Sequence, residues 1–192
     1  MTNVDYLIIG AGAMGLAFAD TLLDETGATI AVVDRYGRPG GHWTRAYPFV
    51  RLHQPSAFYG VNSRVLGTNQ RDTTGGNAGL NELASGAEVL AYFDQVINQR
   101  FIPSGRVTYM PMCEYTEGGA IVSLASGTRR DVQARHIVDA TYMNVSVPSM
   151  RPPSYAVGEG VRCVPPNALT ALDRGAEAYV VVGAGKTGID AC

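Results

Sequence analysis

The sequence is poor in the residues that build disulfide frameworks and metal sites. Its three cysteines, Cys113, Cys163 and Cys192, are odd in number, widely spaced and without a CxxC pair. Its three histidines also lack the spacing of metal ligands. We therefore expect no disulfide scaffold and no metal site, and this cysteine usage favours a cytoplasmic location.

Excess positive charge and long apolar runs are also absent. The formal net charge of the 192 residues is −2, whereas nucleic acids and anionic membranes bind basic surfaces. The longest apolar run, residues 7–19, contains three glycines and is too short to span a bilayer. No positive charge precedes it, which argues against a signal peptide. The sequence therefore predicts neither a nucleic-acid partner nor a membrane partner.

Glycine, by contrast, is abundant and clustered. The chain has 23 glycines, and its 46% hydrophobic and 17% charged residues are sufficient for a buried core. Two apolar runs, residues 4–9 and 29–34, predict buried parallel strands on either side of a helix over residues 13–25. Together, residues 4–34 predict a right-handed βαβ unit.

The rest of the chain alternates between irregular and regular segments. Residues 35–80 are rich in turn-forming residues, and so long an irregular segment in a compact domain is usually functional. A capping box at Ser85 and Glu88 predicts a helix through about Arg100. An antiparallel meander is predicted over residues 106–115, 120–124 and 131–139, then a proline-rich connector over 148–168 and a buried strand over 178–182. The predicted fold class is α/β, a Rossmann-like parallel sheet with helices on one face and the small meander on the other.

A glycine-rich turn follows the first predicted strand. It reads Gly10-Ala11-Gly12-Ala13-Met14-Gly15 and has the GxGxxG pattern between a strand and a helix. Gly10 allows the tight turn, Gly12 lets the backbone approach a pyrophosphate, and Gly15 lets the helix pack on the strand. The helix N-terminus then faces the phosphate charge. The turn therefore predicts a dinucleotide site.

An acidic residue, Asp34, ends the second predicted strand, 22 residues after Gly12. A carboxylate there accepts hydrogen bonds from both ribose hydroxyls of an adenosine and repels a 2′-phosphate. It favours NAD or the ADP half of FAD over NADP. Arg35 follows directly and belongs to the same predicted site. The alternative is a glycine-rich turn with an unrelated surface aspartate.

A second glycine pair follows the acid, in Gly40-Gly41-His42-Trp43. This acid–xxxxx–GG–x–W pattern resembles the FAD-binding half of flavin-containing and Baeyer–Villiger-type monooxygenases. The resemblance implies that Gly41 and its neighbours approach the phosphate and ribityl chain of FAD, with the aromatic residue near the flavin ring. For Trp43 the alternative is a core anchor, which is the commoner fate of a single tryptophan.

Two basic residues of the long loop are candidates for the flavin site. If FAD is bound, Arg51 and His53 are placed to face its isoalloxazine ring, where a positive charge favours developing negative charge. The alternative is an arginine in a surface ion pair and a histidine bonded to the backbone.

A second GxGxxG turn, Gly183-Ala184-Gly185-Lys186-Thr187-Gly188, follows the last apolar run. It is not a P-loop, because Val180 stands where that motif needs glycine. Two such turns, with their first glycines 173 residues apart, resemble two-dinucleotide flavoproteins, in which a nicotinamide domain is inserted into the FAD domain. The resemblance implies an NAD(P)H site formed by Gly183, Gly185, Lys186, Thr187 and Gly188.

A third match lies between these turns. Val138-Asp139-Ala140-Thr141 resembles the ATG strand end of the same family, with Tyr142 in place of the glycine, and adds Thr141 to the predicted FAD site. The histidine motif of the flavin-containing monooxygenases, FxGxxxH, is not recognisable before Gly183. No cysteine lies between Asp34 and Met112, which argues against a dithiol relay in this part of the chain.

These motifs divide the chain into two parts. We interpret residues 1–165 as an incomplete FAD-binding domain. Residues 166–192 are interpreted as the connector and first strand and turn of a truncated NAD(P)-binding domain, because a second βαβ unit needs more residues. We expect a fragment of an FAD- and NAD(P)H-dependent, monooxygenase-like oxidoreductase acting on a small-molecule substrate that the sequence does not identify. The alternative is a nucleotide-binding module without catalysis. The unpartnered strand over residues 178–182 also predicts self-association.

Overall fold

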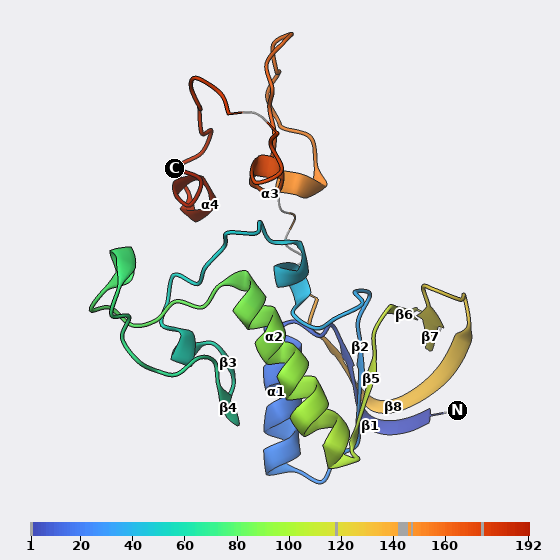
Figure 1. Cartoon of the computed structure of the whole chain (residues 1–192). Coiled ribbons are helices and arrows are strands. Elements are labelled where there is room, and N and C mark those ends of the chain that lie inside the picture. Colours follow the sequence, from blue (N-terminus) through green and yellow to red (C-terminus); the bar gives the residue numbers. More distant parts are fainter. Residues whose placement is uncertain (1, 118, 142–145, 147, 174) are drawn as a thin grey trace.

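The computed structural model describes the chain except for residues 1, 118, 142–145, 147 and 174 (Figure 1). The strands are β1 (Thr2–Ile9), β2 (Ile30–Val33), β3 (Gly60–Val61), β4 (Arg64–Val65), β5 (Val107–Met110), β6 (Cys113–Thr116), β7 (Ala120–Ser123) and β8 (Arg129–Asp139). The α-helices are α1 (Ala13–Glu25), α2 (Gly86–Val96), α3 (Pro166–Leu169) and α4 (Lys186–Ile189). Short helical turns are η1 (Gly41–Arg45), η2 (Ser56–Phe58), η3 (Gly75–Asn77), η4 (Ile97–Phe101), η5 (Ile102–Ser104) and η6 (Pro148–Met150).

Six strands form one mostly parallel sheet in the order β5-β2-β1-β8-β7-β6, and β3 and β4 form a separate antiparallel pair. β1 is parallel to both β2 and β8, and β2 is parallel to β5. The long strand β8 also pairs antiparallel with β7, which pairs antiparallel with β6. The α/β prediction, with a parallel sheet and a small antiparallel meander, is confirmed.

Alternate residues of the central strands serve two cores. Figure 1 shows α1 and α2 on one side of β1 and β2, and the meander strands β6 and β7 on the other. Ile8 and Val32 face the helices, where they join a core with Leu16 and Phe93. Leu7, Ala31 and Val33 face the meander, where they pack with Ile121 and Val132. Because both faces are covered, β1 and β2 are continuously apolar rather than alternating.

Local sequence accounts for the beginning and end of the second long helix. The Ser85 side chain accepts from the backbone N–H of Glu88, and the Glu88 carboxylate accepts from the backbone N–H of Ser85, as the capping box predicts. The helix then widens into a π-type turn, η4, and the segment ends at Gly105, whose φ of 69° stops it. The predicted helix through Arg100 is thus confirmed, with a π-type last turn.

One predicted strand is corrected. Residues 106–115 do not form a single strand of the meander but two strands, β5 and β6, separated at Pro111 and at Met112, whose φ is 51°. β5 lies in parallel register with β2, and only β6 belongs to the meander. The break is explained by the missing N–H of proline and by the positive φ beside it, both of which interrupt a ladder.

The predicted buried strand over residues 178–182 is also wrong. Among the described residues this segment has no assigned strand and no ladder partner, and its side chains are exposed, with Val180 at 88% and Val182 at 68%. A strand gains its stability from a neighbouring backbone. Without one, an apolar run alone does not form a strand.

Candidate functional site

The first glycine-rich turn joins β1 to α1 in the geometry that the motif predicts. Gly10 has a φ of 105°, and its N–H donates to the carbonyl oxygen of Val33 at 2.8 Å. A Cβ on Gly15 would stand within 3.0 Å of the Gly10 carbonyl oxygen, closer than real Cβ contacts. Gly12 caps α1 without a side-chain hydrogen bond. The N–H groups of the first turn of α1 therefore have no capping side chain, so they are available to an anion.

Asp34 is not the surface aspartate of the alternative interpretation. Its side chain is buried, with the residue only 6% exposed, and it holds the turn: Oδ2 accepts from the backbone N–H of Ala11 at 2.5 Å, and Oδ1 accepts from that of Tyr36 at 2.7 Å. Burial raises the pKa of Asp34, which these two hydrogen bonds partly offset. Each carboxylate oxygen keeps a second lone pair. Ribose binding by Asp34 stays a prediction, to which the structure adds a clamping role.

The second glycine pair lies directly on the first turn. The N–H of Gly40 donates to the carbonyl oxygen of Ala11 at 2.8 Å. Gly40 and Gly41 both have positive φ, and a Cβ on Gly41 would lie 3.0 Å from the Cα of Gly12. The two motifs, whose contacting residues lie 29 positions apart in the sequence, thus form one backbone surface, in which a side chain on Gly41 would stand against Gly12.

Trp43 is a core anchor. It is 9% exposed and belongs to the helix-side core, and its indole N–H donates to the Tyr59 hydroxyl at 2.6 Å. The His42 ring stacks on it with centroids 5.4 Å apart. Burial of the imidazole lowers the pKa of His42. Burial of Trp43 favours the alternative interpretation of that residue over a place beside the flavin ring.

The other predicted residues divide into those near the turn and those bound elsewhere. Thr141 is near it: its methyl carbon lies 3.2 Å from where a Cβ on Gly10 would be, and its hydroxyl donates to Asp139 at 2.6 Å. Ala13 and Met14 open α1, with Met14 73% exposed. Tyr142 lies outside the described residues.

Two arginines are bound to other partners. Arg51 donates to the carbonyl oxygen of Leu83 at 2.9 Å, and Arg35 forms an exposed ion pair with Glu114 at 2.9 Å. These contacts favour the structural interpretation of Arg51. His53 is exposed, and its electrostatic interaction with the Asp190 carboxylate of the C-terminal segment contributes to lowering the pKa of Asp190.

The second glycine-rich turn folds in the same way as the first. Gly183 has a φ of 129°, and a Cβ on Gly188 would stand within 3.0 Å of the Gly183 carbonyl oxygen. Gly185 caps α4, which begins at Lys186. The sequence thus correctly predicted the turn, although the strand before it is missing.

Sequence reasoning missed Tyr109, on β5 beside β2. Its hydroxyl oxygen is buried and has no hydrogen-bond partner among the described residues. Burial, together with the carboxylates of Asp34 and Asp94, raises the pKa of Tyr109. In sequence it is one aromatic residue of a strand, and only the pairing of β5 with β2 brings it toward Asp34.

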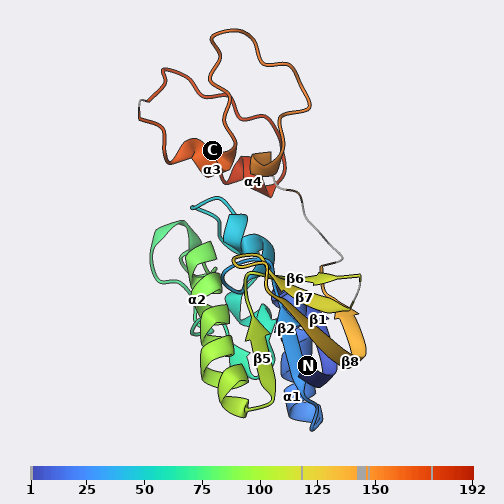
Figure 2. The same cartoon turned by 90° about the vertical axis from the view of Figure 1, so that its right-hand side faces the viewer.

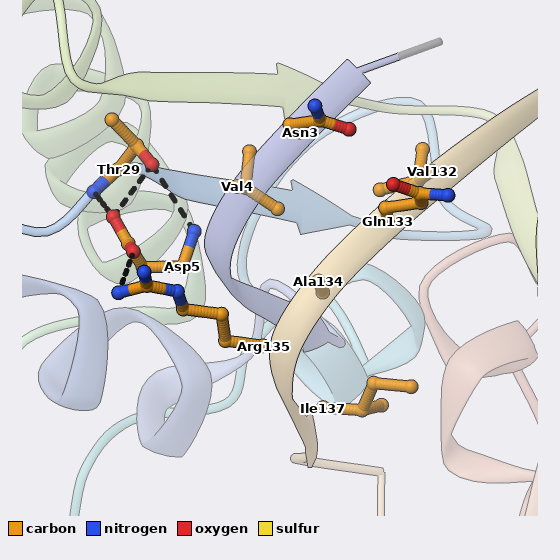
Figure 3. A pocket seen from close by; sticks show the side chains of 9 residues that line it. All are labelled: Asn3, Val4, Asp5, Thr29, Val132, Gln133, Ala134, Arg135 and Ile137. Carbon is orange, nitrogen blue, oxygen red and sulfur yellow. Dashed lines mark hydrogen bonds and ion pairs between the residues drawn. The ribbon is translucent and has the colours of Figure 1, made fainter.

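A hollow of about 730 Å³ lies away from this site. It lies along β1 and β8, near the start of β1, and Figure 3 shows Asp5, Thr29 and Arg135 turned toward one another. Asp5 accepts from the Thr29 hydroxyl at 2.8 Å and pairs with Arg135 at 3.3 Å. The hollow shares no lining residue with either glycine-rich turn. Across the described residues, no three metal-ligating side chains gather, and no helix has the length and apolar character needed to cross a bilayer.

Part of the chain matches a known domain family, and nearly the whole chain is similar to a mycobacterial protein. Residues 8–62 match the NAD(P)-binding Rossmann-like domain. An uncharacterized protein of Mycobacterium tuberculosis is 60% identical over 191 residues, which are 99% of this chain and 35% of that protein. The chain thus spans about a third of the length of this relative.

Two further similarities concern flavin or nucleotide enzymes. A ferredoxin–NADP reductase of Salinispora tropica is 35% identical over 94 residues, 49% of this chain and 29% of that protein. The structure of a flavin-containing monooxygenase from Stenotrophomonas maltophilia superimposes with a TM-score of 0.51 at 24% identity, over 73% of this chain and 39% of that one. The chain therefore has a Rossmann-like α/β fold, which it shares with the structure of this flavin-containing monooxygenase.

Proposed function

We propose that the chain is the FAD-binding part of an NAD(P)H-dependent, monooxygenase-like flavoprotein oxidoreductase. The observation that carries this proposal is the joined backbone surface of Gly12 and Gly41 at the uncapped N-terminus of α1. The similarity to a flavin monooxygenase and to a ferredoxin–NADP reductase supports the same cofactor class.

The residues present fit the adenosine diphosphate half of FAD. A pyrophosphate needs close backbone approach and free N–H groups, and the surface formed by Gly12, Gly41 and the first turn of α1 offers both. The buried Asp34 keeps lone pairs for ribose hydroxyls beside this surface. Its carboxylate disfavours a 2′-phosphate at the same place.

The chemistry that FAD would supply when bound is hydride transfer from NAD(P)H. The residues of this chain would bind and orient the cofactor. Asp34 fixes the turn through Ala11, and Gly40 fixes the following loop to the same residue. Residues 1–165 form the FAD-binding domain in this proposal, and residues 166–192 begin the NAD(P)-binding domain. The second glycine-rich turn supports this division.

A nucleotide-binding module without catalysis is the second candidate. It is favoured by one observation: Arg51, the basic side chain expected at the flavin ring, donates to the Leu83 carbonyl instead. The two candidates share a nucleotide site and differ in redox activity.

The test is a flavin titration of the purified chain, followed by absorbance in the near-UV and blue and by the fluorescence of Trp43, the single tryptophan. Gly12→Val should abolish FAD binding while leaving the circular dichroism largely unchanged, because its side chain would cover the backbone surface. Gly76→Val is the matched control, since a Cβ there meets nothing within 4 Å.

Two results would contradict the proposal: no FAD binding by the unaltered chain, or unchanged affinity in Gly12→Val. Bleaching of the bound flavin by NAD(P)H separates the enzyme from the module, since the module does not bleach.

A further inference from the structure

The second glycine-rich turn makes a polar contact with the loop that follows the first. Tyr47, two residues after η1, is 8% exposed, and its hydroxyl donates to Asp190 Oδ2 at 2.6 Å. Lys186 Nζ donates to the same hydroxyl at 3.4 Å and forms an ion pair with Asp190. Three side chains, one from the loop and two from α4 and its C-cap, therefore form one cluster.

A second contact joins the same two segments. The Nδ2 amide of Asn167, in α3, donates to the carbonyl oxygen of Arg45 at 2.9 Å. Figures 1 and 2 both show α3 and α4 beyond the end of the sheet at which α1 begins, next to the loop that contains η1. The C-terminal segment is thus held to this loop at two points.

The contacts continue without a gap to the first turn. Gly40 is hydrogen-bonded to Ala11 and Gly41 lies against Gly12. η1 then leads through Arg45 to Tyr47. Seven residues of loop therefore connect the backbone of one glycine-rich turn with the helix of the other.

The second turn depends on this contact for its position. α4 has four residues, and a helix of that length is not stable alone. Residues 178–182 lack the sheet that would otherwise hold the turn. The hydrogen bonds that join Tyr47 to Asp190 and Lys186 connect α4 and its cap to the rest of the chain.

We propose that Tyr47 is a positioning residue that docks the second glycine-rich turn onto the loop of the first, so that the two nucleotide sites are oriented as one unit. This inference rests on the proposed function for the existence of two sites. The docking itself is a property of the unliganded chain and is measured without nucleotide.

The test is backbone amide hydrogen exchange of residues 186–190. In the unaltered chain the amides of Ile189 and Asp190, which donate within the turn, should be protected. Tyr47→Phe keeps the ring and removes the hydroxyl, and it should speed their exchange about tenfold, since hydrogen bonds to charged groups are worth that much or more. Tyr59→Phe is the matched control, because the Tyr59 hydroxyl accepts a hydrogen bond from the Trp43 indole N–H, away from α4.

A pH series and a double variant separate docking from a general structural effect. The groups that act on Asp190 are Lys186, Tyr47 and His53. Burial alone would raise the pKa of Asp190, but the hydrogen bonds from Lys186 and Tyr47 hold it below its ordinary 3.8. A lowered pKa stabilises the docked form above that value, so protection should be lost as the pH falls through the lowered pKa. The double variant Tyr47→Phe with Asp190→Asn should exchange no faster than either single variant, because both remove the same contact.

Unprotected amides in the unaltered chain, or protection unchanged in Tyr47→Phe, would overturn the docking. A chain that shows Tyr47-dependent protection but binds no FAD would leave the docking in place and remove the proposed function. Normal FAD binding with no effect of Tyr47→Phe on exchange would overturn the docking and leave the proposed function in place.

Discussion

The two glycine-rich turns have nearly the same backbone and very different surroundings. Their helix caps, Gly12 and Gly185, have φ of −81° in both and ψ of −178° and 175°. Their third glycines, Gly15 and Gly188, each stand against the carbonyl oxygen of the first glycine of their own turn. The six-residue pattern therefore sets the turn locally.

What differs is everything beyond the turn. The first is followed by the 13-residue helix α1, whose inner face is buried, and is preceded by a strand paired on both sides. The second is followed by the four-residue α4 and preceded by an exposed apolar segment. The backbone of the turn thus recurs in different surroundings, whereas a strand needs neighbours.

The largest expected difference between the two turns is in global stability. Gly15→Ala places a methyl group against the Gly10 carbonyl, inside a packed βαβ unit, and should lower the free energy of unfolding by about 3 kcal/mol. Gly188→Ala creates the same overlap with Gly183 in a segment outside the cores, and it should change that free energy by less than about 0.5 kcal/mol. Urea denaturation followed by circular dichroism measures both, and equal effects would refute the comparison.

Next in size is the clamp at the first turn. Asp34→Ala leaves the buried N–H of Ala11 and the partly buried N–H of Tyr36 without their acceptor, which should cost about 1–3 kcal/mol of stability. It should also weaken FAD binding at least tenfold, because charge-assisted hydrogen bonds to the ribose are lost. Asp190→Ala, at the second turn, is the matched control and should leave global stability unchanged. An Asp34→Ala chain with full stability would show that the clamp contributes nothing.

A smaller effect of opposite sign is expected beside the first turn. Tyr109→Phe removes a buried hydroxyl with no partner among the described residues and should raise the free energy of unfolding by about 1 kcal/mol. Tyr92→Phe removes a hydroxyl that accepts from the Val61 N–H at 2.8 Å and donates to the Arg64 carbonyl at 2.6 Å, so it should lower stability by a similar amount. The two variants are compared by denaturation, and a loss of stability in both would contradict the assignment of Tyr109.

The smallest effect on stability should come from the segment before the second turn. Val180→Asp puts a charge on a side chain that is 88% exposed, and it should leave the free energy of unfolding within about 0.5 kcal/mol. It should also reduce any self-association of the chain, because exposed apolar segments pair with other copies. Sedimentation of the two proteins checks this, and a destabilised variant would show that Val180 is buried in solution.

Much of the first βαβ unit was predictable. The apolar runs gave two buried strands, the GxGxxG pattern gave the turn, and α1 begins and ends at the predicted residues 13 and 25. The capping box of Ser85 and Glu88 likewise located the start of α2. These features depend on near neighbours in the chain.

The features that the sequence did not reveal depend on distant neighbours. Apolar character predicted a strand at 178–182, but no strand lies beside it among the described residues. Trp43 fitted a motif by its spacing, yet Tyr59 and the helix-side core determine where it packs. Arg51 was placed by its charge and position in the loop, whereas the Leu83 carbonyl that it bonds was not identifiable from sequence.

The sequence by itself determined the two glycine-rich turns and the class of the fold, because φ, hydrogen bonding within a turn and the burial of apolar runs follow from local residues. Only the tertiary structure decided what touches those turns. Asp34 clamps Ala11, Gly41 lies against Gly12, and Tyr47 meets Asp190 across 143 residues of chain. Such contacts depend on how the sheet and loops bring distant segments together, and that arrangement is not encoded in any single stretch of residues.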